Sequence, residues 1–191
     1  MTATTALTPG DYLGIVFCAS ELFLSLAKRS KATGISKDRG SLWMLWAVIA
    51  ICIFLARTWA FLMPQHRSPF LRSLQPLGEG LVATGLVLRW ASILYLGRFF
   101  TVDVSIAAGQ MVVDTGPYRL IRHPSYTGAL VAFLGLGILF NDWVSLGILM
   151  VPIIIAFLRR ISIEEAALKE GLGEAYIAYC ARTKRLVPWI Y

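Results

Sequence analysis

The sequence predicts an all-α, polytopic membrane protein of about five transmembrane helices with a cytosolic C-terminal helical cap. Hydrophobic residues make up 57% of the 191-residue chain and charged residues only 15%, which is too apolar for a soluble domain of this size. The apolar residues also occur in long runs, and a bilayer core about 30 Å thick needs roughly 20 helical residues to span it. The length fits one domain, covering residues 1–191.

Five apolar runs are the candidate spans. They cover residues 9–27, 41–63, 74–96, 125–140 and 143–158. The first run is interrupted by Asp11 and Glu21, and Pro64 follows the second. The last two runs are predicted to form a helical hairpin that turns at Asn141 and Asp142. Each has only about 16 residues, which is short for a full crossing of the bilayer.

Basic residues alternate in number from one connection to the next. The Lys28–Gly40 loop has five, the connection 97–123 has three and the tail from Arg159 has six. The remaining two connections have only Arg67 and Arg72 between them. The positive-inside rule then places the N-terminus outside and the C-terminus in the cytoplasm. The net charge of +7 is thus explained by basic residues that orient the protein in the membrane. We therefore expect no nucleic-acid partner.

Ionisable residues inside the runs are expected to pair, because single charges at such depths are costly. Their depths predict two ion pairs, Arg57–Glu79 and Glu21–Arg89. The alternative is that each side chain reaches water by itself. Metal and disulfide sites are not expected, because Cys18, Cys52 and Cys180 are far apart and His66 and His123 are the only histidines.

The segment GPYRLIRHPSYTG, residues 116–128, is the most informative for function. It is polar, lies on the predicted cytosolic side, and contains Tyr118, His123 and Tyr126 beside two prolines. Pro124 fits the first turn of the fourth span, where free N–H groups and the helix dipole suit an anion. The alternative is an ordinary helix start with interfacial arginines and aromatic residues.

A second cluster follows the fifth span. Arg160 and Glu164 are four residues apart and therefore share one helix face. Such a pair is usually a surface salt bridge. Here the short chain after the hairpin must bring this helix near Tyr126, so we expect Arg160, Glu164, His123 and Tyr126 to surround one cavity.

These elements together resemble a known family. The segment GPYRLIRHPSYTG, the Arg-x-x-x-Glu-Glu helix and the tail GEAYIAYCARTKRLVPW are similar to the isoprenylcysteine carboxyl methyltransferases and their bacterial relatives. The similarity covers roughly residues 75–191. It divides the chain into an N-terminal two-helix region, 1–73, and a catalytic core, 74–191. The resemblance implies S-adenosyl-L-methionine as the cofactor, held in a pocket unlike the Rossmann type.

The resemblance also implies the site residues. Cofactor contacts would fall at Gln110, Met111, Val112, Val113, Tyr118, His123, Pro124, Ser125, Tyr126 and Glu164. Arg160 would hold the substrate carboxylate and would be catalytic together with Glu164; Asp103 matches more loosely. The chain departs from the family pattern in two places: its N-terminal region is shorter, and it has Gln110 where animal relatives have His. Both departures concern the prenyl-cysteine substrate and not the cofactor.

The favoured function is methyl transfer to the carboxylate of a prenylated or terpenoid-like substrate that enters from the bilayer. A lipid phenol or amine could also be the acceptor. A second hypothesis is an NADPH-dependent, sterol-reductase-like oxidoreductase, although this chain has Ser125 and Ala129 where those enzymes have Asn and an acidic residue. The third is a non-catalytic scaffold. The compact length favours a bacterial inner membrane.

Overall fold

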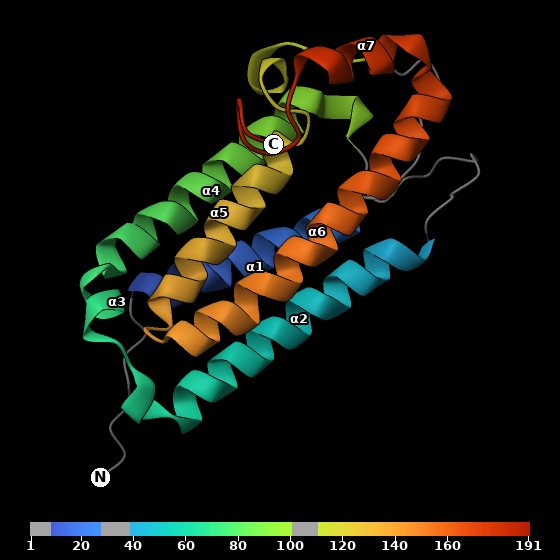
Figure 1. Ribbon diagram of the computed structural model, residues 1–191. Helices are drawn as coiled ribbons and strands as arrows, with labels where there is room; N and C mark the ends of the chain where they lie inside the picture. The colour runs from blue at the N-terminus through green and yellow to red at the C-terminus, as the bar shows by residue number, and fades with distance from the viewer. Residues whose placement is uncertain (1–8, 28–38, 101–110) are drawn as a thin grey trace.

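The computed structural model describes residues 9–27, 39–100 and 111–191, and all regular elements within these ranges are helical (Figure 1). The elements are α1 Pro9–Ala27, α2 Arg39–Leu62, η1 Pro64–His66, α3 Pro69–Ser73, α4 Gln75–Leu96, η2 Gly97–Phe99, η3 Gly116–Arg119, α5 Pro124–Leu139, α6 Trp143–Leu172 and α7 Glu174–Arg182. The predicted all-α class is confirmed.

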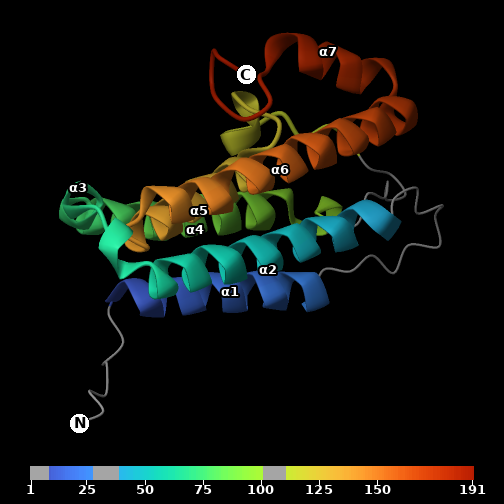
Figure 2. The same cartoon turned by 60° about the horizontal axis from the view of Figure 1, so that its bottom comes forward.

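The helices form two layers. Figure 2 shows α1 and α2 on one side of a layer that contains α4, α5 and α6. Phe17 of α1 meets Phe133 of α5 edge to face, with ring centroids 4.9 Å apart, in the core between the layers. The helix α7 crosses one end of the bundle and α3 lies at the other (Figure 1). The predicted C-terminal helical cap is therefore present.

Three of the described helices are long and apolar enough to cross a membrane. They are Gly40–Leu62, Gln75–Leu96 and Trp143–Leu172, and the shorter apolar helix α5 accompanies them. The protein is therefore an integral membrane protein, for which the predicted count of five spans is approximate. Many large apolar side chains face outward, including Val87 and Leu94, as expected of a lipid-facing surface.

The close packing of α4 and α5 depends on glycine. A Cβ atom on Gly85 would lie 2.5 Å from the backbone oxygen of Gly128, and one on Gly135 would lie 2.5 Å from that of Gly78. Real Cβ contacts are longer, so only glycine lets the two backbones approach this closely. We call these four glycines the glycine seam. It holds the start of α5, and hence His123 and Tyr126, against α4.

The helix α6 is longer than its apolar part. The predicted span covers residues 143–158, whereas the helix runs for 30 residues and includes Arg160 and Glu164. Glu, Ala, Leu and Lys after Arg159 all favour helix, so the change in polarity does not interrupt the backbone. The helix ends at Gly173, whose φ of +56° is a left-handed conformation suited to glycine. At about 1.5 Å per residue, 30 residues span about 45 Å, so α6 extends beyond a bilayer core.

The hairpin turn is confirmed. Asn141 has a positive φ of 58°, and the carboxylate of Asp142 accepts a hydrogen bond of 2.7 Å from the backbone N–H of Ser145. This side-chain cap begins α6.

One of the two predicted ion pairs is confirmed. Arg89 of α4 binds both carboxylate oxygens of Glu21 on α1, and both side chains are buried. The predicted Arg57–Glu79 pair is wrong. Arg57 instead lies 3.6 Å from Asp11, because α2 packs on α6 while α4 packs on α5, and α1 is the helix that Arg57 reaches. Similar depth in the membrane does not make two helices neighbours.

Candidate active site

The C-terminal tail docks on the segment before α5. The backbone N–H groups of Arg122 and His123 donate to the carbonyl groups of Lys184 and Arg185, at 2.7 and 3.0 Å. The hydroxyl of Thr127 donates to the carbonyl of Leu186 at 2.7 Å. These bonds link residues about 60 positions apart in sequence, so the tail folds back over the hairpin as predicted.

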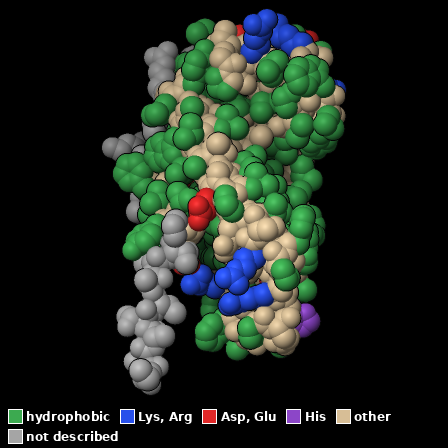
Figure 3. Space-filling model, turned by 90° about the vertical axis from the view of Figure 1, so that its left-hand side faces the viewer, with side chains coloured by type: hydrophobic (Ala, Val, Ile, Leu, Met, Phe, Trp, Pro, Cys, Tyr) green, Lys and Arg blue, Asp and Glu red, His purple; other side chains and the backbone are tan. Residues whose placement is uncertain are grey.

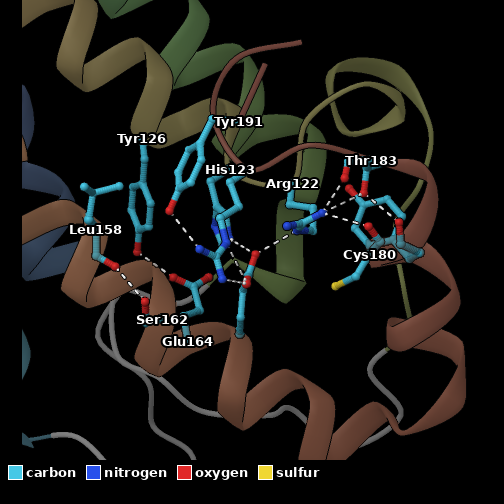
Figure 4. A network of polar contacts seen from close by, with 12 residues as sticks. Arg122, His123, Tyr126, Leu158, Ser162, Glu164, Cys180, Thr183 and Tyr191 are labelled. Carbon is cyan, nitrogen blue, oxygen red and sulfur yellow. Dashed lines mark hydrogen bonds and ion pairs between the residues drawn. The ribbon is translucent and has the colours of Figure 1, made fainter. Parts of the chain in front are cut away.

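Glu165 connects several side chains of a polar network, in which Figure 4 labels Arg122 and His123. One carboxylate oxygen accepts a hydrogen bond from Arg122 Nε at 2.7 Å and lies 3.3 Å from His123 Nε2. The other accepts from Arg185 Nε at 3.0 Å. Only 2% of Glu165 is exposed, so its charge is stabilised by two arginines in place of water. The network fixes α6, the segment before α5 and the tail to one another.

Arg122 has a second function in this network. Its Nη1 donates to the carbonyl groups of Cys180, at 3.1 Å, and of Thr183. These carbonyls lie at the C-terminal end of α7, where the helix leaves backbone acceptors without partners and where a cation is favoured. Arg122 therefore caps α7 and binds Glu165 at the same time.

Beside this network, Tyr126 joins the two residues predicted to be catalytic. Its hydroxyl donates to Glu164 at 2.7 Å, and it also interacts with the guanidinium of Arg160. Its ring stacks on His123 at 5.5 Å and meets Phe157 edge to face at 5.2 Å. Arg160 is 2% exposed, and its Nη1 donates to the hydroxyl of Ser41 at 2.6 Å. A carboxylate and a cation thus lie one helical turn apart beside one phenol.

Tyr118, another predicted cofactor contact, links η3 to α4 and α7. Its hydroxyl donates to the carbonyl of Ser92 at 3.2 Å, and its own carbonyl accepts from the hydroxyl of Tyr179 at 2.7 Å. Burial raises the pKa of Tyr118 well above its ordinary value, and the nearby charge of Glu164 raises it further. The phenol therefore stays neutral and keeps its proton for donation.

The other predicted contacts are placed differently. Ser125 accepts a hydrogen bond from Arg89 at its hydroxyl and another at its carbonyl, both at 3.2 Å, so it belongs to the Glu21–Arg89 pair. Pro124 is buried in the first turn of α5, as expected. Met111 is 67% exposed at the surface, and Val112 and Val113 are half-buried. Gln110 and Asp103 lie outside the described residues.

Three contributors were not predicted from sequence. Glu165 was seen only as a neighbour of Glu164, and Arg185 was counted only as a basic residue of the tail. Adjacent residues on a helix point about 100° apart, so a pair such as Glu164-Glu165 serves two different sites. Ser41 had no signal, because its contact with Arg160 joins the two-helix region to the core.

Comparisons with known proteins agree with this arrangement. A model of the phospholipid methyltransferase family matches residues 74–175. The protein-S-isoprenylcysteine O-methyltransferase B of Arabidopsis thaliana is 31% identical over 59% of this chain and 58% of its own length. The protein-S-isoprenylcysteine O-methyltransferase of Schizosaccharomyces pombe is 29% identical over 58% of this chain and 48% of its own. The chain thus matches about half the length of these relatives.

A solved structure shows the same fold. It is that of a eukaryotic intramembrane Ras methyltransferase, an isoprenylcysteine carboxyl methyltransferase, with a TM-score of 0.67 and 21% identity. The similarity covers 97% of this chain and 70% of that one. The predicted resemblance to isoprenylcysteine carboxyl methyltransferases is confirmed by these matches, and none of them favours the reductase. Because the family model covers more than half of its residues, the chain belongs to the phospholipid methyltransferase family.

Proposed function

We propose that this protein uses S-adenosyl-L-methionine to methylate a lipophilic acceptor, the carboxylate of a prenylated or terpenoid-like substrate. One observation supports this most strongly. Tyr126, in the segment resembling the family motif, binds Glu164 at 2.7 Å and also meets Arg160 on the next turn of α6. Arg160 can hold an anion and Glu164 can hold a cation. The two side chains are therefore placed to bind a substrate carboxylate and a positively charged cofactor.

The side chains present fit the cofactor. When bound, S-adenosyl-L-methionine supplies an electrophilic methyl group attached to a positively charged sulfur. Glu164 is half-buried and can accept hydrogen bonds from an ammonium group or from ribose hydroxyls. The stacked rings of His123 and Tyr126 add aromatic surface, which attracts cations. The cofactor contacts from Met111 to Tyr126, and at Gln110, remain predictions.

Arg160 is the proposed holder of the acceptor. A carboxylate is already ionised at neutral pH, so its methylation needs orientation more than a strong base. The planar guanidinium of Arg160 can bind both carboxylate oxygens, which fixes the attacking oxygen in place. Burial strengthens this attraction, because water competes little at a 2% exposed side chain.

The proposed orientation explains why two ligands can reach one site. With the cap in the cytoplasm, the polar cofactor enters from water and the greasy acceptor enters sideways from the lipid. A bacterial inner membrane is the proposed location. The two-helix region 1–73 and the catalytic core 74–191 are proposed to act as one domain.

Calorimetry with S-adenosylhomocysteine and with NADPH tests the cofactor. We expect binding of the first ligand only, weakened at least tenfold in Glu164→Ala and unchanged in Glu174→Ala, an exposed glutamate on α7. Binding of NADPH alone would contradict the proposal. So would equal affinity of the Glu164→Ala variant and the unchanged protein for S-adenosylhomocysteine.

Turnover of a farnesylated cysteine with a free carboxylate tests the acceptor site. We expect Arg160→Ala to abolish methylation while S-adenosylhomocysteine still binds, which shows that the fold is retained. Arg159→Ala removes an exposed charge from the neighbouring position and should keep turnover. Unchanged turnover in Arg160→Ala would reject the proposed role. Methylation of a long-chain phenol but not of the carboxylate would identify the other acceptor class.

A further inference from the structure

A cavity lies away from the candidate active site. Its volume is about 1220 Å³, and it lies between α1, α2 and α5 and reaches the connection between α2 and α4. Neither Arg160, Glu164 nor Tyr126 lines it. The connection that lines one end of it includes α3, at the end of the bundle opposite the cap (Figure 1).

The lining of this cavity changes along its length. Towards α3 it contains Arg57, which is paired with Asp11, together with Arg67 and Arg72, and Figure 3 shows basic side chains gathered at the lower end of this face. Along α2 the wall is mainly apolar, with Ile49, Ile53 and Phe54 among its residues. A cavity with a cationic end and an apolar length matches an amphiphile with an anionic head.

Some polar groups that line the cavity also lack an ion-pair or hydrogen-bond partner among the described residues. Arg67 and Arg72 are exposed and have no carboxylate partner among the described residues. The amide oxygen of Asn141 is buried in the cavity wall, at the end near α3, with no hydrogen-bond partner in the described part of the chain. Buried polar atoms are normally bonded, so this oxygen is expected to accept a hydrogen bond from the head group of a ligand.

The position of the two arginines in the sequence is informative as well. The connection between α2 and α4 is one of the two predicted to lie outside, where basic residues are sparse. It contains Arg67 and Arg72, and both line the cavity. The positive-inside rule favours few basic residues in an outer connection. Binding of a ligand therefore explains better why Arg67 and Arg72 are present.

We propose that this cavity binds an anionic phospholipid, with the phosphate at Arg67 and Arg72 and an acyl chain along α2. Between Phe61 and Trp46 the helix rises by about 22 Å at 1.5 Å per residue. One leaflet contributes about half of a 30 Å core, so the cavity accommodates the chain of one lipid. This lipid is a resident ligand and not the methyl acceptor, and the proposal is independent of the proposed function.

Lipid exchange followed by mass spectrometry of the protein tests the proposal. Purified protein is equilibrated with phosphatidylglycerol or with phosphatidylcholine of the same chains, and the lipid retained per protein is counted. We expect retention of phosphatidylglycerol to exceed that of phosphatidylcholine roughly tenfold, because each nearby arginine attracts an anionic head group. The R67Q/R72Q variant should retain both lipids equally.

Two further variants separate charge from shape. R119Q/K169Q removes the same charge at the cap and should keep the preference for phosphatidylglycerol. Ala50→Phe narrows the cavity at an exposed position and should lower the retention of both lipids. Equal retention of the two lipids by the unchanged protein would overturn the proposal. Full retention of phosphatidylglycerol by R67Q/R72Q or by Ala50→Phe would also overturn it.

Discussion

The glycine seam and the polar network of the cap hold the same helix, α5, by opposite means. At the seam, Gly85 and Gly128 bring two backbones together because neither has a side chain. At the cap, Glu165 connects three cationic or imidazole groups, each with a fixed direction. Within lipid there is no hydrophobic gain between helices, so shape must hold them, whereas at the aqueous end charge can specify a single arrangement.

The largest effect is expected at the cap. Glu165→Ala leaves Arg122 and Arg185 without their carboxylate, and removing one partner of a buried ion pair costs about 3–5 kcal/mol. The tail should detach from the segment before α5. Limited proteolysis should then cleave after Lys184 or Arg185 many times faster than in the unchanged protein. The exposed Glu174→Ala is the control, and an equally resistant tail in both variants would contradict the importance of the network.

At the seam we expect a smaller loss of stability. In Gly85→Ala, a Cβ atom would lie 2.5 Å from backbone atoms of Gly128 and Ala132, so the helices must separate. Overpacking of this kind costs about 1–3 kcal/mol. Thermal unfolding in detergent measures it.

A matched control lies on the same helix. Gly80 has no atom within 4 Å of its Cβ position, so Gly80→Ala should be neutral or slightly stabilising because alanine favours helix. If both variants melt at the same temperature, close approach is not what the glycines provide.

A single hydrogen bond under the cap should matter less. Tyr179→Phe removes the donor that the carbonyl of Tyr118 accepts at 2.7 Å, in a buried position. Such a loss costs about 1 kcal/mol. Unfolding temperatures of the two proteins measure the difference. Because Tyr118 lies near Glu164, binding of S-adenosylhomocysteine should also weaken, and an unchanged affinity would separate the two effects.

The smallest effect is expected at the rim of the cap. Arg182 and Asp114 form an ion pair whose side chains are 59% and 42% exposed. Exposed pairs contribute less than about 1 kcal/mol and are screened by salt. Arg182→Gln should lower the unfolding temperature slightly at low ionic strength and not at high ionic strength. A large, salt-independent loss would show that the pair acts as part of the buried network.

The sequence predicted what depends on local pattern. Apolar runs located α2 and α4 within two residues at each end, and Pro124, Asn141 and Asp142 marked the start of α5 and the turn before α6. The expected contact of Glu164 with Tyr126 is present, and the continuous helix α6 makes it.

What could not be predicted depends on which helices are neighbours. Arg57 meets Asp11 because of the packing order of α1, α2 and α4, which hydropathy does not encode. Likewise, two adjacent glutamates look equivalent in a sequence. Only the rotation of α6 assigns Glu165 to the arginines and Glu164 to Tyr126.

The hydrogen bond between Ser41 and Arg160 limits which helices can replace the N-terminal region 1–73. The matched family region begins at residue 74, yet the arginine proposed to hold the acceptor is itself held by a hydroxyl from α2. A chimera that replaces residues 1–73 by other apolar helices must therefore supply a polar group at this point. A hybrid that fits the bilayer but lacks that hydroxyl should insert normally and leave its arginine misdirected.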